Sequence, residues 1–109
     1  LYTVTDRGIG YCWEAATGKE KWKARIGKSF IASPIIAGDR IYACSDKGTT
    51  HVFRASPAGF ERLASNPLGD EIYATPSICG NRIYLRCAFR SNGKRTETLY
   101  CIGKTREKP

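Results

Sequence analysis

The chain has 109 residues, a net charge of +8 and no methionine. This length is enough for one domain, and no apolar run approaches the roughly 20 residues that a membrane-spanning helix needs. The charge permits an anionic partner, but the lysines and arginines are scattered, so we interpret most of them as solvated strand positions. Because the chain lacks an initiator methionine, we interpret it as a piece of a longer protein or as a processed product.

Short strands separated by tight turns are predicted along the whole chain. Gly38-Asp39 and Gly80-Asn81 have the composition of two-residue hairpin turns. Residues 90–95 are predicted as a longer loop, and residues 27–29 and 66–70 as crossings between units. The predicted strands are residues 1–5, 9–15 and 19–25, then 32–37, 40–45, 49–55 and 60–64, then 75–79, 82–88 and 96–102.

The sequence repeats itself at a shift of about forty residues, a period typical of β-propeller blades. Asp6-Arg7-Gly8 matches Asp46-Lys47-Gly48, and residues 33–42 reappear as residues 75–84. The apolar residues alternate rather than following helical spacing. The predicted fold is therefore all-β, with antiparallel four-stranded β-propeller blades. We predict a partial blade at 1–28, a complete blade at 29–70, a last blade without its outer strand at 71–103, and a basic tail at 104–109.

One segment carries a family resemblance. Ala15–Trp22, preceded by Glu14, resembles the tryptophan-docking repeat of pyrroloquinoline-quinone (PQQ)-like β-propellers. In that family an acidic residue, a Thr-Gly turn and a Trp recur, and the Trp stacks on the turn and docks on the adjoining blade. The resemblance implies this docking role for Glu14, Thr17, Gly18 and Trp22. In the second copy, Ser56–Gly59 replaces the turn and Leu63 stands near the Trp position.

The resemblance leaves two functions open. The family includes PQQ-dependent alcohol dehydrogenases, the propeller lipoprotein of outer-membrane protein assembly, and other exported or kinase-linked bacterial propellers. The dehydrogenases use a catalytic Asp, calcium ligands and a vicinal disulfide, but no adjacent Cys pair occurs in this chain. Its four aspartates all lie in predicted turns, where Asp bonds its own backbone. They are Asp6, Asp39, Asp46 and Asp70.

We therefore expect no catalytic, cofactor-binding or metal-binding residue and no cofactor. The preferred hypothesis is a non-catalytic protein-binding scaffold within a larger bacterial protein, exported according to the habits of the family. The alternative is the C-terminal blades of a PQQ-dependent alcohol dehydrogenase. Such an enzyme would carry its catalytic residues outside this segment.

Loops on a rigid scaffold usually carry recognition, so one edge of the predicted propeller is a candidate partner-binding rim. The alternative is a set of ordinary solvated turns. Expected partners are the remaining blades or a second copy of the chain, and a protein or peptide. Nucleic acid is disfavoured because the aromatic platforms of single-strand binders are missing. The rim comprises Arg7, Lys28, Phe30, Lys47, Tyr73, Arg90, Lys94 and Arg95.

The single histidine and the five cysteines carry no recognisable motif. His51 is predicted to be a strand residue that faces solvent. The cysteines are predicted to be buried packing residues, with a Cys87–Cys101 disulfide as the alternative. Counting from the turn places Cys101 opposite Tyr84, which disfavours that disulfide.

Overall fold

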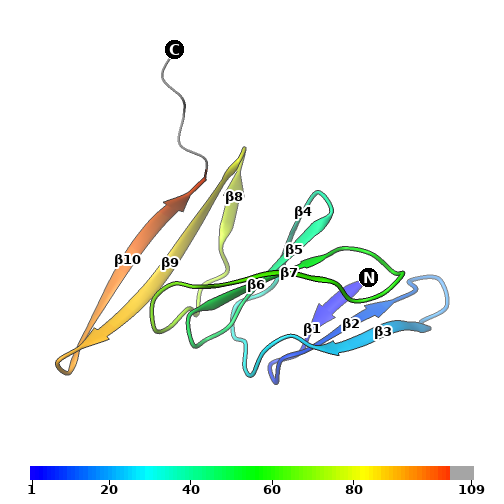
Figure 1. Cartoon of the computed structure of the whole chain (residues 1–109), viewed down its shortest axis with the longest axis horizontal. Coiled ribbons are helices and arrows are strands. Elements are labelled where there is room, and N and C mark those ends of the chain that lie inside the picture. Colours follow the sequence, from blue (N-terminus) through cyan, green and yellow to red (C-terminus); the bar gives the residue numbers. More distant parts are fainter. Residues whose placement is uncertain (104–109) are drawn as a thin grey trace, which may run out of the picture.

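The computed structural model describes residues 1–103, which form ten strands in three antiparallel sheets and no helix (Figure 1). The predicted tail at 104–109 lies outside the described residues. The first sheet has the order β1-β2-β3, the second β4-β5-β6-β7 and the third β10-β9-β8. The strands are β1 Tyr2–Val4, β2 Ile9–Trp13, β3 Glu20–Arg25, β4 Ile35–Ala37, β5 Arg40–Cys44, β6 Thr49–Arg54, β7 Arg62–Pro67, β8 Ser77–Cys79, β9 Arg82–Ser91 and β10 Lys94–Ile102.

The first two sheets share one pairing register. In the first sheet Cys12 lies opposite both Tyr2 and Trp22, and the register shifts between Cys12 and Trp13. In the second sheet Val52 lies opposite both Tyr42 and Ala64, and the register shifts between Val52 and Phe53. Residues that are directly opposite lie on the same face of a sheet. The row Tyr2–Cys12–Trp22 therefore has the row Tyr42–Val52–Ala64 as its structural equivalent.

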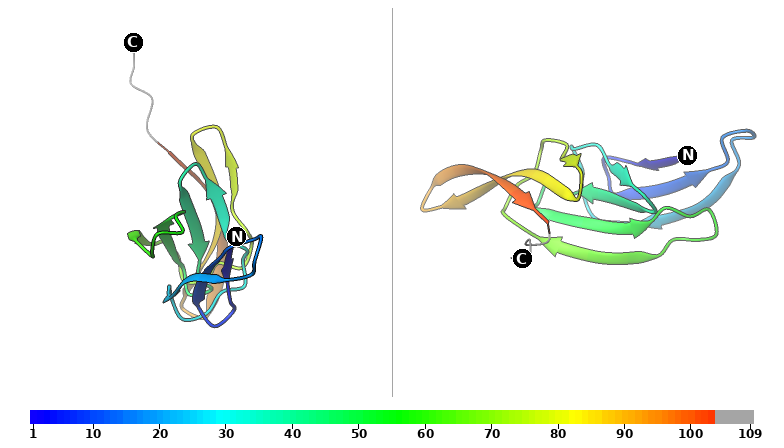
Figure 2. Two further views of the ribbon diagram at one scale, coloured as in Figure 1. Left: turned by 90° about the vertical axis from the view of Figure 1, so that its right-hand side faces the viewer. Right: turned by 90° about the horizontal axis from the view of Figure 1, so that it is seen from above.

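The sheets pack face to face in sequence order, with one apolar core at each junction (Figure 2). The first core joins the first and second sheets, and Cys12, Trp22, Ile41 and Phe53 are buried in it. The second core is smaller and includes Cys44 and Leu85. The molecule measures 48 × 44 × 18 Å, so it is a flat fan of sheets.

Backbone hydrogen bonds tie each crossing to the turn beside it. Phe30 N donates to Asp6 O at 2.9 Å, Asp46 N donates to Ser29 O at 3.1 Å, and Asp70 N donates to Ala88 O at 2.7 Å. Two glycines make the close approach possible: a Cβ on Gly8 would lie 2.1 Å from Gly27 O, and one on Gly48 would lie 2.2 Å from Gly69 O. Their φ angles of +87° and +90° also favour glycine.

The predicted loop at 90–95 was wrong. Ser91 pairs with Lys94, so β9 and β10 are joined by a two-residue turn at Asn92 and Gly93. Both turn residues have positive φ angles, 51° and 76°, as a type I′ hairpin turn requires. The Asn-Gly pair thus specifies a tight turn, and the strands on either side continue to it.

Some predicted strand ends also moved. Residues 32–34 do not pair, so β4 begins only after Pro34. Asn66 and Pro67, which were predicted in a crossing, belong to β7 and pair with Thr50 and Thr49. A proline is tolerated there because β7 is an edge strand, where its missing N–H faces away from the ladder.

Candidate partner-binding surface

Trp22 links the first sheet to the second. The indole is 8% exposed, and its Nε1 donates to the carbonyl oxygen of Ser56 at 2.7 Å. Its ring centroid lies 5.9 Å from that of Phe53 and 5.4 Å from that of Phe60, both with edge-on geometry. On its own sheet the indole lies 6.2 Å from the Tyr2 ring. Trp22 therefore occupies a socket with aromatic walls between two sheets.

The other residues of the same motif shape the hairpin that carries Trp22. Gly18 N donates to Glu14 O at 2.7 Å, and Lys19 N donates to Thr17 Oγ1 at 3.2 Å. Gly18 has a φ of +74°, which permits this reversal. Glu14 also forms a 3.3 Å ion pair with Lys21. The motif thus closes the turn, and Trp22 reaches the turn region of the next sheet.

The second sheet has no aromatic residue at the equivalent place. Sequence comparison placed Leu63 near the Trp position, but the register assigns that position to Ala64. Both sheets carry the bulge at the same place, but the connection from Phe53 to Arg62 is two residues longer than that from Trp13 to Glu20, and this moves the equivalent of Trp22 to Ala64. The side chain that would correspond to the Trp22 indole is therefore a single methyl group.

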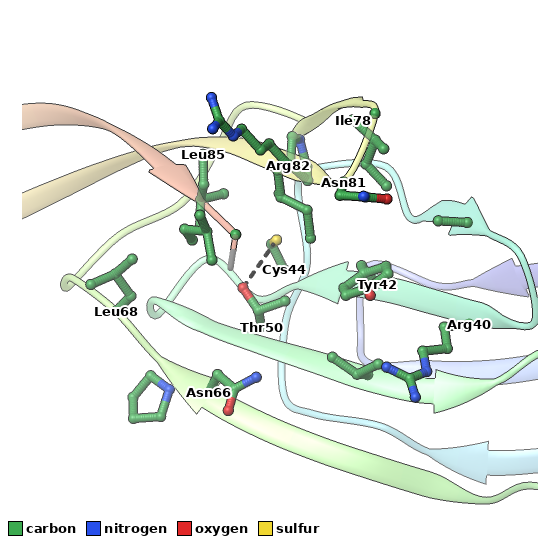
Figure 3. Close-up of a pocket in the computed structure, with 18 residues that line it drawn as sticks. Arg40, Tyr42, Cys44, Thr50, Asn66, Leu68, Ile78, Asn81, Arg82 and Leu85 are labelled. Carbon is green, nitrogen blue, oxygen red and sulfur yellow. Dashed lines mark hydrogen bonds between the residues drawn. The ribbon is translucent and has the colours of Figure 1, made fainter. Parts of the chain in front are cut away.

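A groove of about 780 Å³ lies between the second and third sheets (Figure 3). Tyr42, Cys44 and Thr50 form one wall, and Ile78 and Leu85 contribute to the opposite wall. Val52, Ile83 and Ile102 also line the groove. The groove is mostly apolar and continues the core that joins these two sheets.

His51 does not face solvent freely, which corrects the prediction. Its ring lies 5.8 Å from that of Phe30, and its Nδ1 lies 2.7 Å from Arg62 Nη1. Arg62 also donates to Ile26 O at 2.7 Å and to Ser65 Oγ at 3.0 Å. Burial, and secondarily the Arg62 charge, lowers the pKa of His51 below its ordinary value. Arg62 and His51 thus clamp the second sheet to the end of the first.

The turns that join β1 to β2, β5 to β6 and β9 to β10 lie along one edge of the fan, the lower edge in Figure 1, and most predicted rim residues belong to these turns, to the strand ends beside them or to the crossings. Phe30 is the exception: it is 6% exposed and packs in the first core, so it offers no surface contact. The remaining members are exposed, and three of them lie at the strand ends that flank the Asn92-Gly93 turn. They are Arg7, Lys28, Lys47, Tyr73, Arg90, Lys94 and Arg95.

Glu71 organises the end of this rim. Its carboxylate accepts hydrogen bonds from Tyr73 OH at 2.5 Å, Arg95 Nε at 2.9 Å and Arg90 Nε at 3.1 Å. These three donors lower the pKa of Glu71 to about 2. Arg95 also lies over the Tyr73 ring, 5.8 Å from its centroid. The sequence contained no periodic signal for this cluster, because its members meet only when the crossing packs on the hairpin.

The four cations Arg7, Lys28, Lys47 and Lys94 differ from this cluster. Within residues 1–103, none of them has a carboxylate at salt-bridge distance. These four side chains therefore form no direct ion pair within the described chain, although Asp6 and Asp46 stand beside Arg7 and Lys47 in the sequence.

Comparison with known families identifies this repeat. The family model described as outer membrane protein assembly factor BamB matches residues 1–58, more than half of the chain. The chain belongs to this family of PQQ-like repeats. Its fold is accordingly a segment of a β-propeller, and each of the three sheets corresponds to all or part of a blade. No curated protein matches the chain closely enough to count as a relative.

Within this family segment, three of the four aspartate side chains make structural contacts. Asp39 forms an ion pair with Arg54 at 2.5 Å, Asp70 accepts from the backbone N of Arg90 at 2.7 Å, and Asp46 accepts from the Ser29 hydroxyl. Across residues 1–103, no three His, Cys, Asp or Glu side chains are grouped as metal ligands would be. The same residues contain no helix long and apolar enough to span a membrane.

Proposed function

We propose that this propeller segment is a non-catalytic scaffold that binds a protein partner through its cationic rim. The observation that carries the proposal is a set of four cations without a direct ion pair: Arg7 and Lys47 on turns, Lys28 on a crossing and Lys94 at the start of β10. A backbone held by hydrogen bonds at its turns and crossings loses little conformational freedom when a partner binds. An excess of positive charge steers and orients a partner with an acidic surface.

The contacts of the carboxylates support the non-catalytic part of the proposal. Asp39, Asp46, Asp70 and Glu71 each hold a turn, crossing or hairpin in place. Glu71 in particular is engaged by three donors, which leaves little of its charge for chemistry. These roles account for these four carboxylates without a catalytic function.

The family description supports an exported location. The matching model is named for an outer membrane protein assembly factor, and we infer that the longer protein containing this chain works outside the cytoplasm with protein partners. Fractionation of cells that express the full-length protein tests this location. Recovery in the cytoplasm alone would contradict it.

Site-specific photo-crosslinking tests the rim. A photoreactive residue replaces Lys47 or Lys94 in the full-length protein, and the matched control replaces Lys19, which is exposed on the Thr17-Gly18 hairpin. We expect a discrete protein adduct from the rim positions and none from Lys19. Equal adducts at all three positions, or none at the rim, would contradict the proposal.

An activity measurement separates the scaffold from a quinoprotein. The full-length protein is titrated with PQQ and calcium, and dye-linked alcohol oxidation is recorded. The scaffold function predicts no saturable quinone binding and no turnover. Reconstituted oxidation would establish the dehydrogenase instead.

A further inference from the structure

The groove between the second and third blades is the counterpart of the socket that Trp22 fills at the first junction. In the first junction, one wall carries Tyr2 and Cys12 and the other carries Ile41 and Phe53. In the second junction the equivalent walls carry Tyr42 and Val52, and Ile83 and Ile102. These residues of the second junction, Tyr42, Val52, Ile83 and Ile102, all line the groove.

The pairing register supports this equivalence on both walls. Tyr2, Cys12 and Trp22 form one row, and Tyr42, Val52 and Ala64 form the matching row. On the receiving side, Ile41 pairs with Phe53 and Ile83 pairs with Ile102. The same positions of two successive repeats thus enclose an indole at one junction and a groove at the other.

The cause of the difference lies in the residue at the Trp position. Ala64 ends at its Cβ and does not itself line the groove, so no side chain at the Trp position reaches the third blade as Trp22 reaches the second. From β7 the groove is lined only by Asn66 and Pro67. The lost indole alone is a substantial part of the packing, because an aromatic side chain buries about 150–250 Å². The groove volume of about 780 Å³ lies within the range of pockets that bind ligands.

The groove also continues an existing interface. Cys44 and Leu85 line it and belong to the buried core between the second and third blades. Ile78 and Ile102, at its outer part, are 37% and 41% exposed. A planar apolar group entering from this side would extend the core and cover these isoleucines.

We propose that this groove binds an aromatic side chain presented by a protein partner. The occupant takes the place that Trp22 has at the first junction, with its ring between Tyr42 and Val52 on one side and Ile83 and Ile102 on the other. The proposal rests on the protein-binding function proposed above and adds a second, apolar anchor point to it. The groove and the cationic rim are lined by different residues.

The probe for the test is N-acetyl-tryptophanamide, with N-acetyl-alaninamide as its control. Binding to the full-length protein is followed by methyl NMR signals of Ile83 and Ile102. We expect saturable shifts with the tryptophan compound and none with the alanine compound. Equal responses to the two compounds, or no response to either, would overturn the proposal.

Two variants test whether the probe binds in the groove. Ala64→Trp fills the groove from β7, and we expect the affinity for the probe to fall at least about tenfold because the indole site is already occupied. Leu99→Trp is the matched control, since Leu99 is 68% exposed on the opposite face of the third blade. It should leave the affinity unchanged.

A second variant, Ile102→Glu, tests the groove if the Ala64→Trp protein does not fold. Ile102→Glu places a carboxylate at the exposed part of the groove and should also weaken binding at least about tenfold, because a charge resists burial beside an apolar ring. Leu99→Glu adds the same charge to the other face of β10 and should bind normally. Unchanged binding by Ile102→Glu would overturn the proposal.

Probe binding and rim crosslinking test the groove and the cationic rim independently. Loss of the rim crosslinks with retained probe binding contradicts the cationic docking surface and leaves the aromatic groove supported. Retained crosslinks without probe binding overturn the groove alone. If the groove signals of the full-length protein already report a buried environment that excludes the probe, a segment of the same chain fills it and the proposal is overturned.

Discussion

The five thiols of the chain differ sharply in their access to solvent. Cys12, Cys44 and Cys87 are buried, while Cys79 and Cys101 are exposed, so the prediction of burial was wrong for the last two. Cys101 lies opposite Tyr84, as predicted, and all five cysteines are free. Burial raises the pKa of Cys44 and Cys87, which lowers the fraction of reactive thiolate.

Thiol labelling should therefore separate two classes. We expect Cys79 and Cys101 of the native protein to react rapidly with an aromatic disulfide reagent, and Cys12, Cys44 and Cys87 to react only after denaturation. Peptide mapping of the labelled protein identifies the sites. Rapid native labelling of Cys44 or Cys87 would contradict the packing between the second and third blades.

The His51–Arg62 clamp makes stability depend on pH in a definite direction. The pKa of His51 is lowered from 6.5 in the folded protein, first by burial and then by the Arg62 charge. Below pH 6.5 the unfolded chain binds a proton that the folded chain resists, so the unfolded state gains stability. The folded protein therefore loses stability as the pH falls from about 6.5 towards the lowered pKa.

We expect the thermal unfolding midpoint to fall as the pH is lowered through this window. His51→Gln removes the titrating group and should flatten that part of the profile relative to the native protein. Profiles of equal slope for the two proteins would show that His51 does not couple protonation to folding.

At the scale of the element, the tryptophan hairpin provides much of the contact between the first two blades. Trp22→Ala removes a buried indole and should lower the free energy of unfolding by about 3–5 kcal/mol. Trp22→Phe keeps part of the ring contact but loses the bond to Ser56 O, so its loss should be smaller. Chemical denaturation measures both values.

The control for these variants is Lys19→Ala, on the exposed turn of the same hairpin, which should change the stability by less than about 0.5 kcal/mol. If Trp22→Ala were as stable as this control, the socket between the blades would carry no packing energy. The comparison between the Trp22 socket and the groove at the second junction would then have no consequence for stability.

The hairpins of the three sheets show how much of the fold could be predicted from the sequence. The alternation of apolar residues and the Gly-Asp and Gly-Asn turns specified the antiparallel strands, because these signals act between residues close in the chain. Placing Ala64 was beyond such reasoning, since the connection between Phe53 and Arg62 is two residues longer than that between Trp13 and Glu20, and only the pairing shows where the extra residues lie. The loop at 90–95 was misread because its charged residues outweighed the Asn-Gly turn signal.

The candidate surface was less predictable than the strands. The exposed rim residues could be located from turn chemistry, but Phe30 and His51 are covered by a neighbouring blade. Likewise, the bonds from Tyr73, Arg90 and Arg95 to Glu71 depend on how the crossing meets the last hairpin. Contacts between blades leave no periodic trace within one blade.

At the scale of the whole molecule, the fan is more extended than a compact domain. Its radius of gyration is 15.2 Å, whereas a compact domain of this length has about 13 Å. On the first blade, Leu1 and Trp13 stand where Ile41 and Phe53 stand on the second, and Leu1 is 68% exposed. The first blade therefore presents the receiving half of a socket on its open face.

This open face predicts that the isolated 109-residue chain associates with itself. An apolar face on one copy and a different face on the next form a head-to-tail contact, which can continue from copy to copy. Sedimentation velocity should show a mass that increases with protein concentration.

Trp13→Arg places a charge on the open face and should shift the distribution towards the monomer, because the charge would have to be buried in the contact. Lys19→Arg, which preserves the charge at an exposed turn, should sediment like the original chain. A monomer at the highest soluble concentration would mean that the open faces are stable in water, and the dependence of these blades on neighbours would have to be abandoned.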